Sequence, residues 1–197
     1  DIDMSFIDAF FESTSGITTT GATVIVNLEA KSHGILIWRA LLQWLGGVGI
    51  IVMALAVLPM LSIGGMQLFK TESYETPDKV VPKAASFAAG ISIVYITLTV
   101  IWALMLWGAG MPMFDSIAHA MTTLATGGYS TKSESLAAFN SSTIEIIIIL
   151  GMLVGSLPFV HYLALTKNGI KNLINDDQVK LFLTLVLFVV LIMSLYL

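Results

Sequence analysis

Two short polar segments, each carrying a glycine, could place backbone carbonyl oxygens around a cation. They are Thr18-Thr19-Thr20-Gly21-Ala22-Thr23 and Ala125-Thr126-Gly127-Gly128-Tyr129-Ser130. Irregular backbone at membrane depth is tolerated only where it is buried in protein or lines a water-filled cavity. In ion filters such segments turn their carbonyls inward and replace the hydration shell of the ion. Uncharged oxygens of this kind suit a monovalent cation, which they can bind and still release.

The surrounding elements have the order expected of re-entrant pore loops. Each polar segment follows an apolar stretch too short to cross a bilayer, residues 6–17 and 113–124, and each is followed by a polar connection and a long apolar run. A span of the hydrocarbon core needs about 20 apolar residues. The pattern therefore predicts a short helix, a glycine-bearing loop and a long helix, present twice.

The two segments also have the marks of an internal duplication. Aligning Gly21 with Gly128 sets an offset of 107 residues, which places Thr19 on Thr126 and Asp8 on Asp115. These identities are few, but they coincide with the repeated hydropathy profile. Internal repeats of this kind are common in membrane transport proteins.

Composition assigns the chain to the membrane. Of its 197 residues 56% are hydrophobic and only 11% are charged, against about 25% charged in soluble proteins. The net charge of −4 gives no reason to expect a nucleic-acid partner, and the absence of cysteine excludes disulfides, thiolate metal sites and thiol catalysis. The chain starts without a methionine or a signal sequence, and we expect it to be a fragment of a longer protein.

Along the chain we expect pore helices and spanning helices in alternation. The expected pore helices are residues 4–17 and 113–125, and the expected spans are 35–61, 84–113, 143–166 and 181–197. The loops 62–83 and 167–180 carry more lysines than the pore-side connections, so the positive-inside rule puts these two loops in the cytoplasm and the filter outside. Glycines 46, 47, 49, 151 and 155 are expected to serve helix packing more than bending.

The remaining polar residues favour no catalytic centre. Arg39 is expected to snorkel or to pair with an acid such as Glu29 or Glu12, with a gating charge as the alternative. Glu145, near the outer end of a span, could be an ion-attracting vestibule charge, although a structural role is favoured. The histidines at 33, 119 and 161 lack the spacing of a transition-metal site. We therefore expect no enzyme activity.

Four segments together resemble the Trk/Ktr/HKT superfamily, in particular the potassium-translocating membrane subunits of bacterial Trk systems. The segments are residues 10–23, 43–50, 58–61 and 125–130, and the likeness covers essentially the whole chain. The resemblance implies one pore built from four non-identical helix–pore loop–helix units. On it, the K⁺ filter would map onto Thr19, Thr20, Gly21, Thr126, Gly127 and Gly128.

The resemblance implies an all-α membrane protein with repeated units of a potassium-channel-like pore. Residues 1–66 would be the pore loop and second helix of unit one, 84–166 all of unit two, and 181–197 the start of unit three, with cytoplasmic linkers at 67–83 and 167–180. The chain would contribute two of four filter loops.

The implied function is potassium uptake across the bacterial cytoplasmic (inner) membrane, with K⁺ as the transported ion and no organic cofactor. The expected partners are the lipid bilayer, a second copy of the full subunit and, from the resemblance, a cytoplasmic nucleotide-binding regulatory subunit. Two alternatives stay open: a sodium-permeable or weakly selective cation transporter of the same superfamily, and a membrane assembly scaffold without transport.

Overall fold

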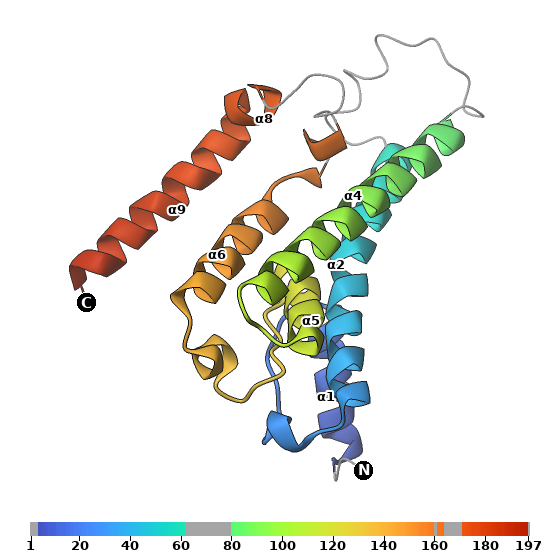
Figure 1. Ribbon diagram of the computed structural model, residues 1–197. Coiled ribbons are helices and arrows are strands. Elements are labelled where there is room, and N and C mark those ends of the chain that lie inside the picture. The colour runs from blue at the N-terminus through green and yellow to red at the C-terminus, as the bar shows by residue number, and fades with distance from the viewer. Residues whose placement is uncertain (1–3, 62–79, 160, 164–170, 197) are drawn as a thin grey trace. The chain divides into compact units, whose positions relative to one another are not determined.

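The computed structural model describes residues 4–61, 80–159, 161–163 and 171–196. The chain divides into two compact units, Asp1–Ser156 and Leu157–Leu197. Every regular element in these described ranges is helical (Figure 1), as the sequence predicts.

Two short helices precede the polar segments. α1 spans Phe6–Ile17 and begins with a capping box, in which the Ser5 side chain accepts from the Asp8 backbone and the Asp8 side chain accepts from the Ser5 backbone. Such caps satisfy amide groups that have no partner within the helix. α5 spans Met113–Leu124 and follows Pro112, whose fixed φ suits the start of a helix.

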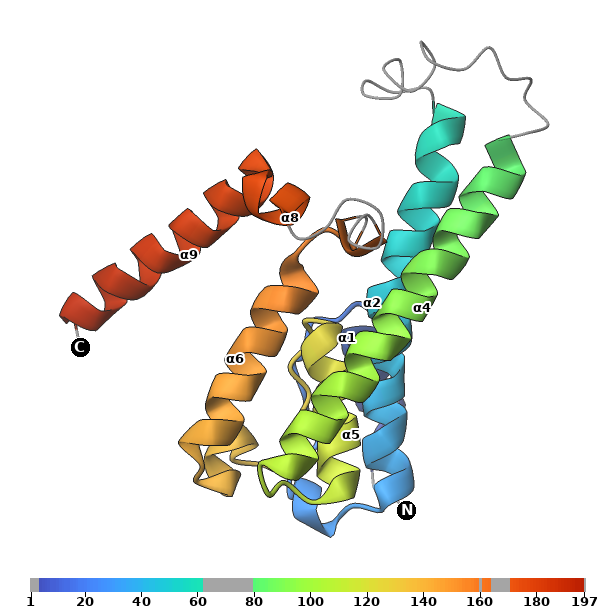
Figure 2. The same cartoon turned by 45° about the horizontal axis from the view of Figure 1, so that its top comes forward.

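Longer helices surround these two in the first unit. They are α2 (His33–Leu61), α4 (Val80–Gly108) and α6 (Ser142–Ser156). α5 packs against all three of them and α1 packs against α2, so that α5 lies at the centre of the first unit, as the turned view in Figure 2 makes clear. The short 3₁₀ helices η1 (Leu28–Ala30) and η3 (Ser135–Phe139) lie in the connections that follow the polar segments.

Glycines let α2 and α6 approach the C-terminal ends of α1 and α5 closely. A Cβ on Gly46 would collide with the carbonyl oxygen of Ile17 at the end of α1, and one on Gly47 would come within 3.0 Å of Ala125 at the end of α5. A Cβ on Gly155 of α6 would lie 2.9 Å from the carbonyl oxygen of Leu124, whereas one on Gly49 would meet open space. Packing explains these glycines, except for Gly49.

Several expected boundaries differ from the structure. α4 ends at Gly108, before the expected end of that span at residue 113. The span expected over 143–166 is interrupted, because α6 ends at Ser156, two residues before Pro158, which lacks a backbone N–H and disfavours helical angles in the residue before it. The loop expected over 62–83 ends sooner, since α4 begins at Val80. The rest of that loop, 62–79, lies outside the described residues.

The second unit holds α8 (Lys171–Asn175) and α9 (Asp177–Tyr196). α9 begins before the expected boundary at residue 181 because Asp176 Oδ1 accepts hydrogen bonds from the backbone of Gln178 and Val179. Among the described residues, two helical stretches are long and apolar enough to cross a membrane, Ala88–Gly108 and Asp177–Tyr196.

Candidate ion-binding loops

The two polar segments, far apart in sequence, meet in the first unit. A Cβ placed on Gly21 would collide with the carbonyl oxygen of Gly127, so the two loops are in direct backbone contact. Of the six predicted site residues, only Gly127 is buried; Thr20, Thr126 and Gly128 are exposed, and Thr19 and Gly21 are half-buried. The structure thus brings the six predicted residues to one place.

The backbones of the two loops match at the offset found in the sequence. Moving the bounds of α1 by 107 residues gives the bounds of α5. Thr19 and Thr126 both have φ of 54°, and Gly21 and Gly128 have φ of 81° and 79°. Each loop therefore alternates a left-handed residue with an ordinary one, and this match supports the duplication independently of residue identity.

Left-handed threonines are unusual and imply that the surroundings hold the loops. For a residue with a Cβ the left-handed region costs about 1–2 kcal/mol, and such conformations persist where neighbouring structure over-determines them. The pore-helix ends supply part of that restraint. The Thr20 amide donates to the Ser15 carbonyl at 3.0 Å, and the matching Gly127 amide donates to the Thr122 carbonyl at 2.9 Å.

These hydrogen bonds also set the direction of the loop carbonyls. In a trans peptide the C=O points opposite to the N–H that shares its plane, and no peptide bond in the described residues is cis. Because the amide of Thr20 points back to α1, the Thr19 carbonyl points away from that helix. The same argument turns the Thr126 carbonyl away from α5. Each loop thus presents carbonyl oxygen on the side remote from its own pore helix.

A buried ion pair joins the two loops. Arg39 of α2, only 3% exposed, donates from Nε to Glu12 Oε1 at 2.7 Å. The same guanidinium donates to Thr23 Oγ1 of the first loop and to the Ser130 carbonyl of the second, both at 3.0 Å. The expectation that Arg39 pairs with an acid is confirmed for Glu12.

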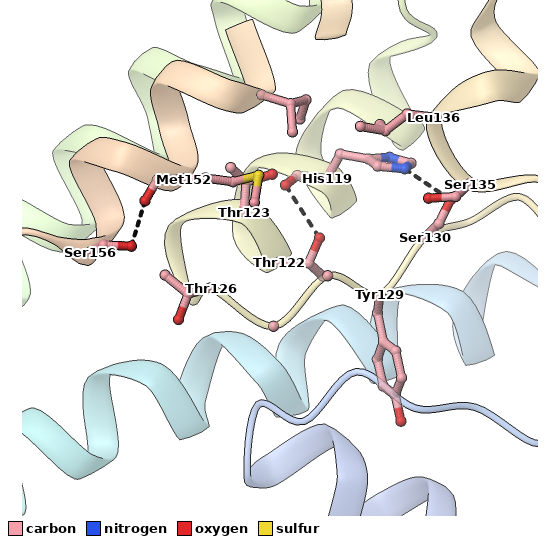
Figure 3. Close-up of a pocket in the computed structure, with 13 residues that line it drawn as sticks. His119, Thr122, Thr123, Thr126, Tyr129, Ser130, Ser135, Leu136, Met152 and Ser156 are labelled. Carbon is pink, nitrogen blue, oxygen red and sulfur yellow. Dashed lines mark hydrogen bonds between the residues drawn. The ribbon is translucent and has the colours of Figure 1, made fainter. Parts of the chain in front are cut away.

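Tyr129 extends this network towards the first loop. Its ring lies 4.1 Å from the Arg39 guanidinium, a cation–π distance. Its hydroxyl donates to the carbonyl oxygens of Glu12 at 2.9 Å and of Ala22 at 3.2 Å. In Figure 3 Tyr129 points towards the first loop, away from the other side chains drawn. Sequence reasoning did not single out these contacts, since they join residues 90 or more positions apart.

The second pore helix holds its loop with a different residue in the matching position. Residue 119 corresponds to residue 12, and 130 to 23, at the offset of 107. Where Glu12 accepts from Thr23 Oγ1 at 2.9 Å, His119 Nε2 lies 3.0 Å from Ser130 Oγ. Its Nδ1 lies 2.8 Å from the Asp115 carbonyl oxygen, which can only accept, so Nδ1 carries a proton. His119 therefore braces the second loop.

The other two histidines and Glu145 have different surroundings. His33 stacks on Phe114 with 4.1 Å between ring centres, and His161 Nε2 is 3.4 Å from Asp176 in the second unit. Glu145 is exposed in the first turn of α6. Within the described residues no three metal-ligating side chains gather.

A pocket of about 250 Å³ opens beside the second loop. Its walls include His119 and Thr122 of α5, Thr126 of the loop, and Met152 and Ser156 of α6 (Figure 3). The first loop has no part in this pocket. The second loop therefore contacts the first loop and also lines an open cavity.

The connections beyond the two loops are tied together. Glu29 accepts hydrogen bonds from the Ser133 backbone and hydroxyl, both at 2.7 Å, and the Ser133 hydroxyl accepts from the Leu28 amide at 3.1 Å. The hydrogen bonds from Ser133 hold the pKa of the Glu29 carboxyl below its usual range. Both connections consequently lie at the same end of the first unit, as the common entry of the two pore loops requires.

Comparison with known proteins places this geometry in a family. The chain matches the family described as TrkH, cation transport protein, over residues 2–197. It is 42% identical to the Trk system potassium uptake protein TrkH of Salmonella typhimurium over 198 residues, which cover 99% of this chain and 41% of that protein. Identity to the Trk system potassium uptake protein TrkI of Halomonas elongata is 41%, over 98% of this chain and 39% of that protein.

A solved structure has the same fold. The crystal structure of the potassium transporter TrkH from Vibrio parahaemolyticus superposes with a TM-score of 0.80 at 40% sequence identity, over 95% of this chain and 38% of that one. The chain spans about two fifths of the length of the curated relatives it matches. By sequence and by fold, this chain belongs to the TrkH family of cation transport proteins.

Proposed function

We propose that the chain forms half of the ion pathway of a potassium-uptake subunit, with its two loops as two of four selectivity-filter strands. The observation that carries this proposal is the shared backbone of the loops, left-handed at Thr19 and Gly21 and again at Thr126 and Gly128. The relatives whose names include potassium uptake support K⁺ as the substrate.

The proposed mechanism is carbonyl coordination without bond chemistry. The Thr19 and Thr126 carbonyls, directed away from their pore helices, would take the place of water around K⁺, together with neighbouring carbonyls at Thr20, Gly21, Gly127 and Gly128. Binding by neutral oxygens is strong enough for entry and weak enough for release. Two strands enclose only part of an ion, so the remaining strands would come from the rest of the full-length subunit.

The setting of this pathway follows the same proposal. The subunit would lie as a multi-pass protein in the bacterial cytoplasmic membrane, pair with a second copy, and bind a nucleotide-binding regulatory protein on its cytoplasmic face. The loops 62–83 and 167–180 are expected on that face, and their residues 62–79 and 167–170 lie outside the described residues. No catalytic role is proposed for any residue.

Ion flux into vesicles containing the purified full-length subunit tests the proposal. The expected result is uptake of K⁺ that a large excess of Na⁺ inhibits only weakly. Equal uptake of both ions would favour the weakly selective transporter, and absence of any flux, with correctly folded protein, would favour the assembly scaffold.

A further inference from the structure

The carboxamide of Gln43 occupies the contact between the two loops. Gln43 lies on α2 and is fully buried, with 0% of its side chain exposed. Its Oε1 accepts a hydrogen bond from the Tyr129 amide at 3.0 Å. A Cβ on Gly127 would collide with its Cδ, and one on Gly21 would lie 3.7 Å from its Nε2. One side chain of α2 thus lies against both loops.

The orientation of this carboxamide is fixed by the loop. Since the Tyr129 amide is a donor, the oxygen of Gln43 must face it. The Nε2 group then points elsewhere, and it has no hydrogen-bond partner among the described residues. A buried donor without a partner is unfavourable, whereas an apolar side chain of similar volume would avoid that penalty. Packing alone therefore does not account for a glutamine at this position.

The hydrogen bond determines where one filter carbonyl points. The Tyr129 N–H shares its peptide plane with the Gly128 carbonyl, and in a trans peptide the two groups point in opposite directions. Holding the N–H on Gln43 therefore directs the Gly128 carbonyl away from α2. On its own, Gly128 would allow this plane to rotate, because a glycine with φ of 79° and open space around it resists rotation only weakly.

The second repeat has no such group in the matching position. Gly46 packs against the carbonyl of Ile17, and Gly155 packs in the same way against the carbonyl of Leu124. Counting back three residues from each glycine pairs Gln43 with Met152. Methionine cannot accept an amide hydrogen bond of comparable strength. The contact is thus specific to the first repeat.

We propose that Gln43 is a positioning residue of the filter, which fixes the Gly128–Tyr129 peptide plane and through it the preference for K⁺ over Na⁺. This inference rests on the proposed function, and it adds a residue outside the loops to the determinants of selectivity. Gln43 acts through the Tyr129 amide and does not touch the ion.

A double-mutant cycle in the full-length subunit tests this. One change is Gln43→Met, which copies the residue of the second repeat. The other replaces Tyr129 by its α-hydroxy analogue, so that an ester replaces the amide and the N–H donor is lost while the ring remains. Competitive K⁺ and Na⁺ flux is measured for both changes, separately and together, with Leu45→Met on the exposed face of α2 as the control.

Gln43→Met should lower the preference for K⁺ over Na⁺ by about two- to tenfold, the value of one hydrogen bond. The ester should lower it by at least as much, because it also makes the Gly128 carbonyl a weaker acceptor. The apparent KM for K⁺ should rise more than the maximal rate falls. Combined, the two changes should be no worse than the ester alone, because both remove the same interaction. Leu45→Met should match the unmodified protein.

Additive effects, or an unchanged preference in either single variant, would overturn the role of Gln43. If Gln43→Met does not accumulate in the membrane, the ester decides alone: a normal K⁺ preference in the ester variant rejects the inference. These outcomes are distinct from failure of the proposed function, in which the unmodified subunit itself would not discriminate between the two ions.

Discussion

At the scale of single residues, Arg39 and Glu12 link the two repeats. The guanidinium of Arg39 contacts a pore helix, the first loop and the second loop, and it does so while almost fully buried. A buried pair of charges contributes little relative to apolar residues, but removal of one partner leaves the other charge uncompensated. The pair therefore acts as a restraint on loop geometry.

Arg39→Met should therefore destabilise the full-length subunit strongly, by about 3–5 kcal/mol. The variant leaves Glu12 buried with its charge and frees the Ser130 carbonyl. Thermal unfolding in detergent, followed by Trp fluorescence, measures the effect. The matched control is Lys31→Met, at a half-buried position of the connection. Equal melting temperatures for the two variants would contradict the claim that the Arg39–Glu12 pair restrains the loops.

Glu29 makes the link between the two connections dependent on pH. Hydrogen bonds from Ser133 lower the pKa of Glu29 below its ordinary value of 4.5. A carboxyl with a depressed pKa in the folded state contributes stability above its unfolded pKa, and that contribution is lost as the pH falls through the folded pKa. The Ser133 amide should therefore exchange its hydrogen slowly at neutral pH and faster, after correction for intrinsic rates, well below pH 4.5.

The control for this pH dependence is Glu29→Gln. In this variant the corrected exchange rate of the Ser133 amide should not change over the same pH range. If the rate still rises at low pH, Glu29 is not the source of the pH dependence.

At the scale of elements, α2 is the helix that aligns the two pore-helix ends. Gly46 faces the end of α1, Gly47 faces the end of α5, and Gln43 and Arg39 lie on the preceding turns of the same helix. Small residues permit this close approach in membrane helices. The position of each loop thus depends on the spacing between α2 and the two pore helices.

Gly46→Ala should push α1 away from α2 and lower stability by about 1–3 kcal/mol, because the new methyl group would overlap the Ile17 carbonyl. Gly49→Ala, with open space around it, should be neutral or slightly stabilising, since alanine favours helix by about 1 kcal/mol. Unfolding midpoints of the two variants provide the comparison. A Gly49→Ala variant as unstable as Gly46→Ala would mean that helix flexibility, rather than contact, explains these glycines.

The sequence predicts the elements better than it predicts the contacts between them. Apolar lengths and glycines locate both pore helices and both loops, and the offset of 107 predicts that the loops are alike. Threonine rarely adopts left-handed angles, so the conformation of Thr19 and Thr126 could not be derived from residue preferences. The contact of Gln43 with Tyr129 depends on the rotation of α2 about its axis, which a helix apolar on all sides does not reveal. The break before Pro158 was available in the sequence, but the apolar residues on both sides favoured one continuous span.

At the scale of the whole molecule, the proposed orientation in the membrane rests on the distribution of lysines and on the shared end of the two connections. A cysteine replacing Ser135 of η3 should react with an impermeant thiol reagent outside intact cells, and one replacing Ser73 should not. This chain contains no cysteine. Only cysteines elsewhere in the full-length subunit would have to be replaced before labelling. Reaction at Ser73, with protection at Ser135, would reverse the proposed orientation.

The central claim, that these two loops select the ion, is tested most directly by the ratio of K⁺ to Na⁺ flux through Gly21→Ala and Gly128→Ala variants of the full-length subunit. Both glycines have left-handed angles, which a residue with a Cβ adopts at a cost of about 1 kcal/mol or more. Gly21→Ala should reduce the ratio more, by at least about tenfold, since its methyl group would also collide with the Gly127 carbonyl, whereas Gly128 has space around it. Gly49→Ala should leave the ratio unchanged. If both loop variants reach the membrane in normal amounts and keep the ratio of the unmodified protein, the loops are not the filter.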